Sequence, residues 1–435
     1  MRTRRMMVLL FVALLLAGVS ALAQGGPAWQ VSAADALVLQ SGVGMRVFPS
    51  PDGQRVAYDR TVRLNGHRDY YACVASVVAE EEPLCLEPSE ALPRGFDPDP
   101  GSYFVPFGWS PDGARLAVVG QPLVTASDTD LWIIDLATGT WERLVDDGYD
   151  GPLAATADQP GPPPGVIVQV QPTWSPDGTQ IAVEQTVTGE DGGLGRATLS
   201  VVDAATGAVR DLAPLPGSEA YPLDAGSTTS LAWSPDGTSL AAAIRHREAD
   251  PDHDGVWLVD VQSGEWERLA SLAVIEEALQ GLYAGTPLES VGPLLWSPDG
   301  ERLLLWAGNP SARPVAVWAF WVALESEEVT AVPLPTHPRD TDSRRTIWPF
   351  QATWSPDGTA LLVAANGVHP DEPEMPLDSE SRRARVSLYL VDVEAGEHYL
   401  LGQLPIGPVA PLYLAAWGAG GDAVLDGYHL TLLPR

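Results

Sequence analysis

Short apolar runs alternate along most of the chain with a recurring polar turn. Residues Tyr103 to Phe107 precede the pentapeptide Trp-Ser-Pro-Asp-Gly at 109–113, and Leu116 to Val119 follow it. In such a turn Pro suits the first central position, Asp tolerates the second, and Gly adopts the left-handed conformation that closes a bulged hairpin. Each copy therefore predicts a hairpin between two strands, with its Asp as a turn residue rather than a catalytic carboxylate.

The pentapeptide repeats at nearly even spacing, with 58 to 65 residues between successive copies. A copy at 49–53 has Pro in place of Trp, and a decayed copy at 417–421 reads Trp-Gly-Ala-Gly-Gly. Regular repeats of this kind are typical of architectures in which each unit packs on its neighbours. The intact copies lie at 109–113, 174–178, 233–237, 296–300 and 354–358.

A second pattern follows the pentapeptide in four units. It is an apolar strand that ends in Asp, then three residues, a Gly and a further strand, as in Leu131 to Asp135, Gly139 and Thr140 to Leu144. The other three strands end at Asp203, Asp260 and Asp392, whereas the fifth unit has Ala323 and Glu327 in place of the Asp and the Gly. Each unit thus holds four strands in meander order (A, B, C and D), which is the organisation of a propeller blade.

We therefore predict an all-β fold, a seven-bladed β-propeller of four-stranded antiparallel blades, formed by one domain at 24–435. The last unit offers a B strand near 423–425 and a C strand near 428–433, but no D strand. An N-terminal strand at 33–40 is expected to fill that place and to remove two open sheet edges. The predicted blades start near residues 45, 103, 168, 229, 291, 349 and 411.

The motif residues resemble a known family. Trp-Ser-Pro-Asp-Gly before an apolar strand, followed by Leu-Tyr/Trp-Val-Val-Asp and a Gly, is similar to the TolB-like, WD40-like β-propeller repeat, over nearly all of 45–435. The resemblance implies a propeller fold.

The N-terminus has the features of a secretory signal peptide at 1–23. Arginines precede the apolar run Met6 to Val19, and Ala21-Leu22-Ala23 forms a cleavage site before Gln24. A membrane anchor is the alternative, although the apolar run is short for a span. We expect an exported protein, periplasmic or extracellular, with no membrane insertion after cleavage.

The charge of the chain is strongly acidic. Its 25 basic residues, all Arg, stand against 57 acidic ones, for a net charge of −32. Such a charge repels nucleic acid and anionic membrane surfaces, so neither is expected as a partner.

The two cysteines, Cys73 and Cys85, fall in the C and D strands predicted for the first unit. A cross-strand disulfide fits both the hairpin and an oxidising compartment. Two buried free thiols are the alternative.

The long and variable connections are all of the B–C or D–A type, and these share one face of a propeller. Variable loops on a rigid scaffold often carry binding sites, so that face is the predicted binding face. Within one of these connections, residues 272–283 have helical character and are expected to cap it. The connections lie at 61–69, 89–102, 146–166, 214–228, 246–255, 271–290, 334–348 and 367–385.

One B–C loop carries a candidate metal site. Asp250, Asp252 and Asp254 alternate before Gly255, as in loops that gather oxygen ligands for calcium. The twelfth position is Val261 rather than Glu, so the loop is not an EF-hand. A solvated acidic loop is the alternative. No cofactor is required by the sequence, and calcium is the one it suggests.

Histidines and arginines also fall mainly in or beside the long connections. Oligogalacturonate lyases resemble this repeat pattern and use a histidine-bound metal, whereas exposed histidines without a common partner are the alternative. Clustered arginines can clamp carboxylates or pair with neighbouring acids. The residues are His67, His246, His253, His337, His369, His398, His429, Arg245, Arg247, Arg313, Arg339, Arg344, Arg345, Arg382, Arg383 and Arg385.

Two functions follow as hypotheses. The first is a non-enzymatic propeller that binds a protein, peptide or glycan through its long loops. The second is a metal-dependent lyase or hydrolase that acts on acidic polysaccharide. The sequence contains no Gly-x-Ser-x-Gly, His-Glu-x-x-His or Gly-x-Gly-x-x-Gly motif, and no Lys for a P-loop or a Schiff base. We therefore favour the first.

Overall fold

The computed structural model describes the greater part of the propeller repeats. Its description covers residues 29–36, 43–52, 54–64, 67–76, 82–86, 102–122, 130–146, 148–149, 164–165, 167–189, 194–217, 228–245, 253–279, 288, 290–309, 316–334, 348–366, 385–405, 416–417, 422–425 and 428–434.

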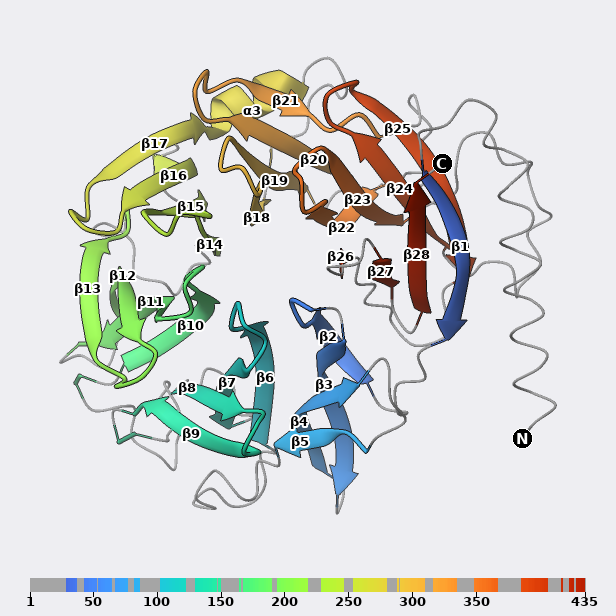
Figure 1. Ribbon diagram of the computed structural model, residues 1–435. Helices are drawn as coiled ribbons and strands as arrows, with labels where there is room; N and C mark the ends of the chain where they lie inside the picture. The colour runs from blue at the N-terminus through green and yellow to red at the C-terminus, as the bar shows by residue number, and fades with distance from the viewer. Residues whose placement is uncertain are drawn as a thin grey trace.

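The strands form six sheets, which follow one another in a ring (Figure 1). Within each unit, consecutive strands pair antiparallel from the inner strand outward. Four sheets are plain meanders of four strands. They comprise β10 (Ile167–Trp174), β11 (Gln180–Thr188), β12 (Leu194–Asp203) and β13 (Val209–Pro214); β14 (Thr228–Trp233), β15 (Ser239–Arg245), β16 (Gly255–Asp260) and β17 (Trp266–Ser271); β18 (Ser290–Trp296), β19 (Arg302–Asn309), β20 (Ala316–Ala323) and β21 (Val329–Ala331); and β22 (Trp348–Trp354), β23 (Ala360–Asn366), β24 (Arg385–Asp392) and β25 (Glu397–Pro405).

The prediction of seven blades is wrong, because the propeller has six. The strands of the first two repeat units form one sheet of eight strands, joined by a parallel pairing of β4 with β6 at Tyr70 and Tyr103. The repeat spacing predicts four strands for each unit, but it does not predict edge pairing between two units. This sheet comprises β2 (Val43–Pro49), β3 (Arg55–Leu64), β4 (His67–Ser76), β5 (Leu84–Leu86), β6 (Ser102–Trp109), β7 (Arg115–Pro122), β8 (Asp130–Asp135) and β9 (Thr140–Val145).

The remaining sheet combines strands from the two ends of the chain. Strand β1 (Trp29–Ala36) pairs antiparallel with β28 (Tyr428–Pro434), and β27 (Asp422–Leu425) and β26 (Ala416–Trp417) complete the order β1-β28-β27-β26. The N-terminal strand at Trp29–Ala36 overlaps the predicted segment 33–40 and begins a few residues before it. It occupies the outer position of this sheet, which joins the two ends of the chain.

Hydrophobic core residues lie between neighbouring sheets rather than in one central cluster. Leu131 and Val145 of the eight-stranded sheet, for example, share a cluster with Ile181 and Val202 of the next. Among the described side chains, such clusters connect β6–β9 to β10–β13 and each following sheet up to β22–β25, and their burial stabilises the ring.

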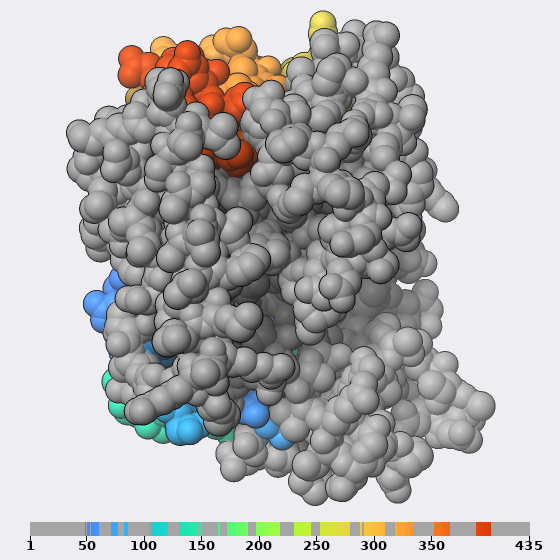
Figure 2. Space-filling model, turned by 90° about the vertical axis from the view of Figure 1, so that its right-hand side faces the viewer, coloured from blue at the N-terminus to red at the C-terminus, as the bar shows by residue number. Residues whose placement is uncertain are grey.

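A short helix, α3 (Leu272–Leu279), follows β17 and confirms the helical character predicted for this segment. Its Leu272 and Ile275 side chains are buried in the cluster between the sheets β14–β17 and β18–β21. Figure 2 faces the side of the ring on which β1 and β28 lie; residues of the late strands, in orange and red, are at its top, and residues of the eight-stranded sheet are at its base. Among the described residues, no helix combines the length and hydrophobicity that a bilayer span needs.

Candidate functional site

Each A–B turn is held by the Ser and Asp of its pentapeptide. In the turn between β14 and β15, Ser234 Oγ donates to Asp236 Oδ1 at 2.6 Å and accepts from the Ser239 amide at 3.0 Å. The Thr238 amide also donates to Asp236 Oδ1, at 3.1 Å. The same contacts recur in the turns of the other described units, which confirms the interpretation of the Asp as a turn residue.

The Trp of the pentapeptide joins each unit to the one before it. Its indole N–H donates to the carbonyl of the residue that precedes the pentapeptide in the preceding unit, and its ring is buried. The bonds are Trp109 to Phe48 (2.9 Å), Trp174 to Gly108 (3.1 Å), Trp233 to Thr173 (2.9 Å), Trp296 to Ala232 (3.0 Å) and Trp354 to Leu295 (3.4 Å). The aromatic residue thus sets the spacing between neighbouring units.

The C–D turns form a second layer on the same face. Asp260 Oδ1 accepts from the amides of Gln262 and Ser263, at 3.0 and 2.6 Å. Gly264, with a φ of +75°, passes so close to the preceding sheet that an added Cβ would lie 2.6 Å from the Leu212 carbonyl oxygen. The C–D turns at Gly207 and Gly264 therefore pack tightly against the outer strand of the preceding sheet.

Between the sheets β10–β13 and β14–β17 these turns leave an open cleft of about 650 Å³. It is the size of an ordinary ligand pocket. Its lining combines two A–B turns, one C–D turn, the start of β11 and the start of β13. The lining residues are Ser175, Pro176, Asp177, Gln180, Arg210, Trp233, Pro235, Asp236, Gly237, Thr238, Asp260, Val261 and Gln262.

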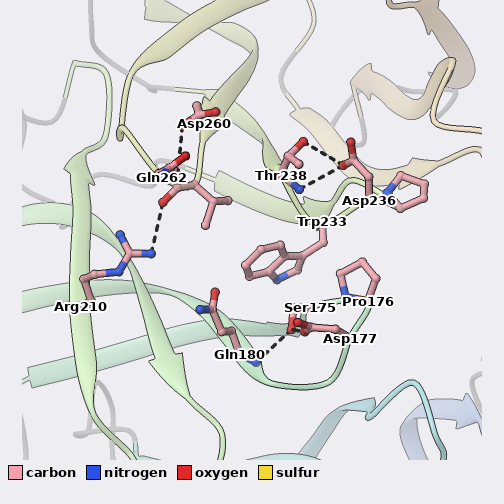
Figure 3. A pocket seen from close by; sticks show the side chains of 13 residues that line it. Ser175, Pro176, Asp177, Gln180, Arg210, Trp233, Asp236, Thr238, Asp260 and Gln262 are labelled. Carbon is pink, nitrogen blue, oxygen red and sulfur yellow. Dashed lines mark hydrogen bonds between the residues drawn. The ribbon is translucent and has the colours of Figure 1, made fainter.

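Figure 3 shows how the cleft is arranged. Trp233 lies at its centre, with Gln180 below it and Arg210 on the β13 side. The Arg210 guanidinium donates from Nη2 to the Val261 carbonyl at 3.2 Å. Arg210 otherwise lies exposed at the edge of the cleft.

The cleft has an acidic character at neutral pH. Hydrogen bonds from the Ser175 and Ser234 hydroxyls lower the pKa of Asp177 and of Asp236, and the Ser263 amide lowers the pKa of Asp260. Since donors to a carboxylate favour its charged form, all three stay ionised well below neutral pH. Three carboxylates and one guanidinium thus line the cleft.

The predicted calcium loop is only partly within the described residues. Asp250 and Asp252 lie outside them. Asp254 lies just before β16, with its side chain fully buried, and its backbone carbonyl accepts from the Leu272 amide at 3.2 Å. Among the described residues there is no group of three or more His, Cys, Asp or Glu side chains that could hold a metal. Calcium at this loop stays a prediction, and a melting temperature that chelator leaves unchanged would contradict it.

Cys73 and Cys85 face each other in the register of β4 with β5. A disulfide joins them, with an S–S distance of 2.07 Å, and Cys73 is fully buried. The bond attaches the three-residue strand β5 to the longer β4.

The predicted histidine and arginine clusters fall almost entirely outside the described side chains. Two histidine side chains are described, that of His253 just before β16 and that of His398 on β25. The His253 carbonyl accepts from Trp257 Nε1 at 3.0 Å, and the His398 ring lies 6.0 Å from that of Tyr389. Most of the long connections that carry the predicted binding face also lie outside the described residues.

The cleft and its residues Gln180 and Arg210 were not predicted from the sequence. A usable signal was nonetheless present, at the fifth position after the Ser of each pentapeptide. That position is Arg in three units and a shorter residue in the other three: Arg55, Arg115, Gln180, Ser239, Arg302 and Ala360.

Strand order and the ring of sheets define this chain as a β-propeller. Among solved structures, it is similar to an oligogalacturonate lyase in complex with manganese, with 13% identity, 93% of this chain and 97% of that chain covered, and a TM-score of 0.47. It is also similar to Kuenenia stuttgartiensis hydrazine synthase, with 15% identity, 92% and 97% covered, and a TM-score of 0.49. A third is the β-propeller domain of Myceliophteria thermophila Cps50 (Swd1), with 14% identity, 94% and 99% covered, and a TM-score of 0.43.

These similarities concern the fold alone. The similar structures include enzymes as well as a propeller domain, so they do not distinguish one activity from another. No protein-family model and no curated protein matches the chain. Function has to be argued from the site.

Proposed function

We propose that this chain is a binding propeller that receives a protein or peptide segment in the cleft between the sheets β10–β13 and β14–β17. The observation that carries the proposal is the cleft itself. Its volume of about 650 Å³ and its mixture of an aromatic ring, backbone carbonyls and charged side chains suit a few side chains of a peptide. The surrounding turns are rigid, because each is held by its own Ser–Asp hydrogen bonds.

The charge of the cleft favours this ligand over an acidic polysaccharide. Asp177, Asp236 and Asp260 would oppose the carboxylates of a polyuronate, and like charges at an interface cost affinity. The lyase hypothesis depends on histidines whose side chains mostly lie outside the described residues. It therefore stays a prediction without support from the described site.

The experiment is a screen of short immobilised peptides against the protein and two variants. Gln262→Trp places a large ring at the rim of the cleft, on an exposed turn position. Ala205→Trp is the matched control, because Ala205 is the exposed equivalent position in the C–D turn of the preceding unit. We expect bound peptides to lose about tenfold or more in affinity with Gln262→Trp and to keep it with Ala205→Trp. Absence of any bound peptide, or binding that Gln262→Trp leaves intact, would overturn the proposal.

We further propose that the chain is an exported member of the TolB-like repeat family. The proposal rests on the residues of 1–23, on the pentapeptides and on the Cys73–Cys85 disulfide, since disulfides persist in oxidising compartments. Expressed with its leader in a bacterium that exports proteins, the mature chain is expected to begin at Gln24 and to carry no free thiol. Mass spectrometry of the intact and alkylated protein checks both. A retained leader with two alkylated cysteines would contradict the export proposal.

A further inference from the structure

An arginine of the chain itself fills the groove one interface earlier in the ring. Arg115, at the start of β7, reaches across to the sheet β10–β13. Its guanidinium donates from Nη1 to the Ala204 carbonyl at 3.1 Å and from Nη2 to the Gly178 carbonyl at 2.8 Å. The guanidinium carbon lies 4.8 Å from the centre of the Trp174 ring. The groove between these two sheets is thus a complete guanidinium site, occupied from within the chain.

The cleft between β10–β13 and β14–β17 repeats this site without its arginine. One repeat later, Trp233 stands for Trp174, Gly237 for Gly178 and Val261 for Ala204, but Gln180 stands in the place of Arg115. A glutamine side chain is shorter and carries no charge. Gln180 therefore supplies no guanidinium at the place equivalent to that of Arg115, and the cleft lies at this place.

Arg210 replaces only part of what Arg115 does. It approaches from β13 and donates to the Val261 carbonyl alone. Among the described contacts, no donor reaches the Gly237 carbonyl, which lines the cleft. One of the two carbonyl acceptors of the site is therefore available to a ligand.

The charges around the cleft favour a cation. Asp177, Asp236 and Asp260 all line it, and the net charge of the whole chain is −32. At the next interface, between β14–β17 and β18–β21, Ser239 takes the Arg115 position and is also short. The C–D turn there has Ala323 in place of the aspartate. At the interface of β10–β13 with β14–β17, Gln180 takes the Arg115 position and all three turn aspartates (Asp177, Asp236 and Asp260) are present. Among the described units, this interface has both features together.

We infer that this cleft binds the guanidinium of an arginine side chain presented by a peptide or protein partner, in the position that Arg115 fills at the preceding interface. The inference rests on the proposed function and names the chemistry of its ligand. A planar guanidinium suits the site better than an ammonium, because it can donate to the Gly237 carbonyl and to a carboxylate oxygen at once while its flat face lies against Trp233.

The test titrates blocked tripeptides, acetyl-Gly-X-Gly-amide, into the protein by calorimetry. X is arginine, citrulline, which keeps the shape without the charge, or glutamate. Gln180→Arg rebuilds the side chain of Arg115 and closes the cleft. Arg115→Gln is the reciprocal variant. It opens the preceding groove, which also has its three turn aspartates, Asp112, Asp177 and Asp203.

The expected results form a set. The arginine peptide binds one site on the natural chain, about tenfold or more tightly than the citrulline and glutamate peptides. Gln180→Arg removes this binding, and Arg115→Gln raises the stoichiometry to two sites. Because Arg115→Gln also removes contacts of the fold, its melting temperature is measured alongside, and the arginine peptide is expected to raise it.

Other results would overturn the inference in distinguishable ways. Equal binding of the citrulline peptide, or binding that survives Gln180→Arg, would show that no guanidinium is recognised in the cleft. Peptides from the immobilised screen that bind the cleft without any arginine would leave the proposed function standing and reject its ligand. A screen in which no peptide binds would reject the proposed function itself.

Discussion

At the scale of single residues, the pentapeptide assigns one task to each side chain. Ser and Asp close their own turn, whereas the Trp acts between units, through an indole bond to a carbonyl of the preceding unit. A bond across an interface contributes to the ring as a whole. Loss of this hydrogen bond should therefore lower the free energy of unfolding of the entire protein.

Trp296→Phe and Trp354→Phe form a matched pair for this bond. Both rings are buried, and both substitutions remove the same atoms. The Trp296 indole lies 3.0 Å from its acceptor and the Trp354 indole 3.4 Å, which is near the limit of a hydrogen bond. We expect Trp296→Phe to cost about 1 kcal/mol more in the free energy of unfolding. Urea denaturation followed by circular dichroism measures the difference, and equal losses would contradict the role given to the indole.

The turn aspartates also predict how stability depends on pH. The Ser355 hydroxyl, with further donors in the turn, lowers the pKa of Asp357 below its ordinary 3.8. A carboxylate whose folded pKa is depressed stabilises the fold above the unfolded value, and this contribution is lost as pH falls from 3.8 through the lower folded pKa.

Asp357→Asn tests this dependence, since Asn keeps an acceptor oxygen but does not titrate. The urea midpoint is measured from neutral pH down to values below 3.8. We expect it to fall less steeply for Asp357→Asn than for the natural chain. Parallel curves would show that Asp357 does not contribute to acid sensitivity.

At the scale of elements, the C–D turns bring neighbouring sheets together. Gly207 has a φ of +70°, and an added Cβ would lie 2.2 Å from the Leu144 carbonyl oxygen of the preceding sheet. Gly396 has a similar φ of +65° in its own C–D turn, but nothing lies within 4 Å of the corresponding Cβ. Substitution of these two glycines therefore separates the cost of a side chain in the left-handed conformation from the cost of a clash between sheets.

Gly396→Ala is expected to cost about 1 kcal/mol, because a side chain disfavours the left-handed conformation. Gly207→Ala is expected to cost about 2 kcal/mol more, because the backbone of one sheet has to move away from the other. Thermal and urea unfolding of the two variants give the comparison. If both lose the same amount, the close approach of turn and sheet does not limit stability.

These elements also show what the sequence could predict. The hairpins at the pentapeptides and the strands before Asp135, Asp203 and Asp260 could be predicted, because turn residues and apolar runs are local signals. The cleft could not be predicted from its own residues. The cleft can be recognised only when equivalent positions of two units are compared, because Gln180 stands where Arg115 fills the neighbouring groove.

At the scale of the whole molecule, the ring follows from the repeats, but its division into sheets does not. Seven units predicted seven blades, and the pairing of β4 with β6 leaves six sheets. Such pairing depends on how two sheet edges meet in space, which no single repeat encodes. The long loops predict a binding face on one side of the ring, and most of them lie outside the described residues. The cleft proposed above lies among the short A–B and C–D turns of the other face.

The proposed role of the whole ring depends on an arginine side chain that enters the cleft between β10–β13 and β14–β17. The most direct measurement is a crystal structure of the protein with the acetyl-Gly-Arg-Gly-amide peptide. We expect electron density for a guanidinium against Trp233, within hydrogen-bonding distance of the Gly237 carbonyl, and with the position of Arg115 unchanged. A peptide bound elsewhere, or an arginine that points out of the cleft, would contradict the proposed role.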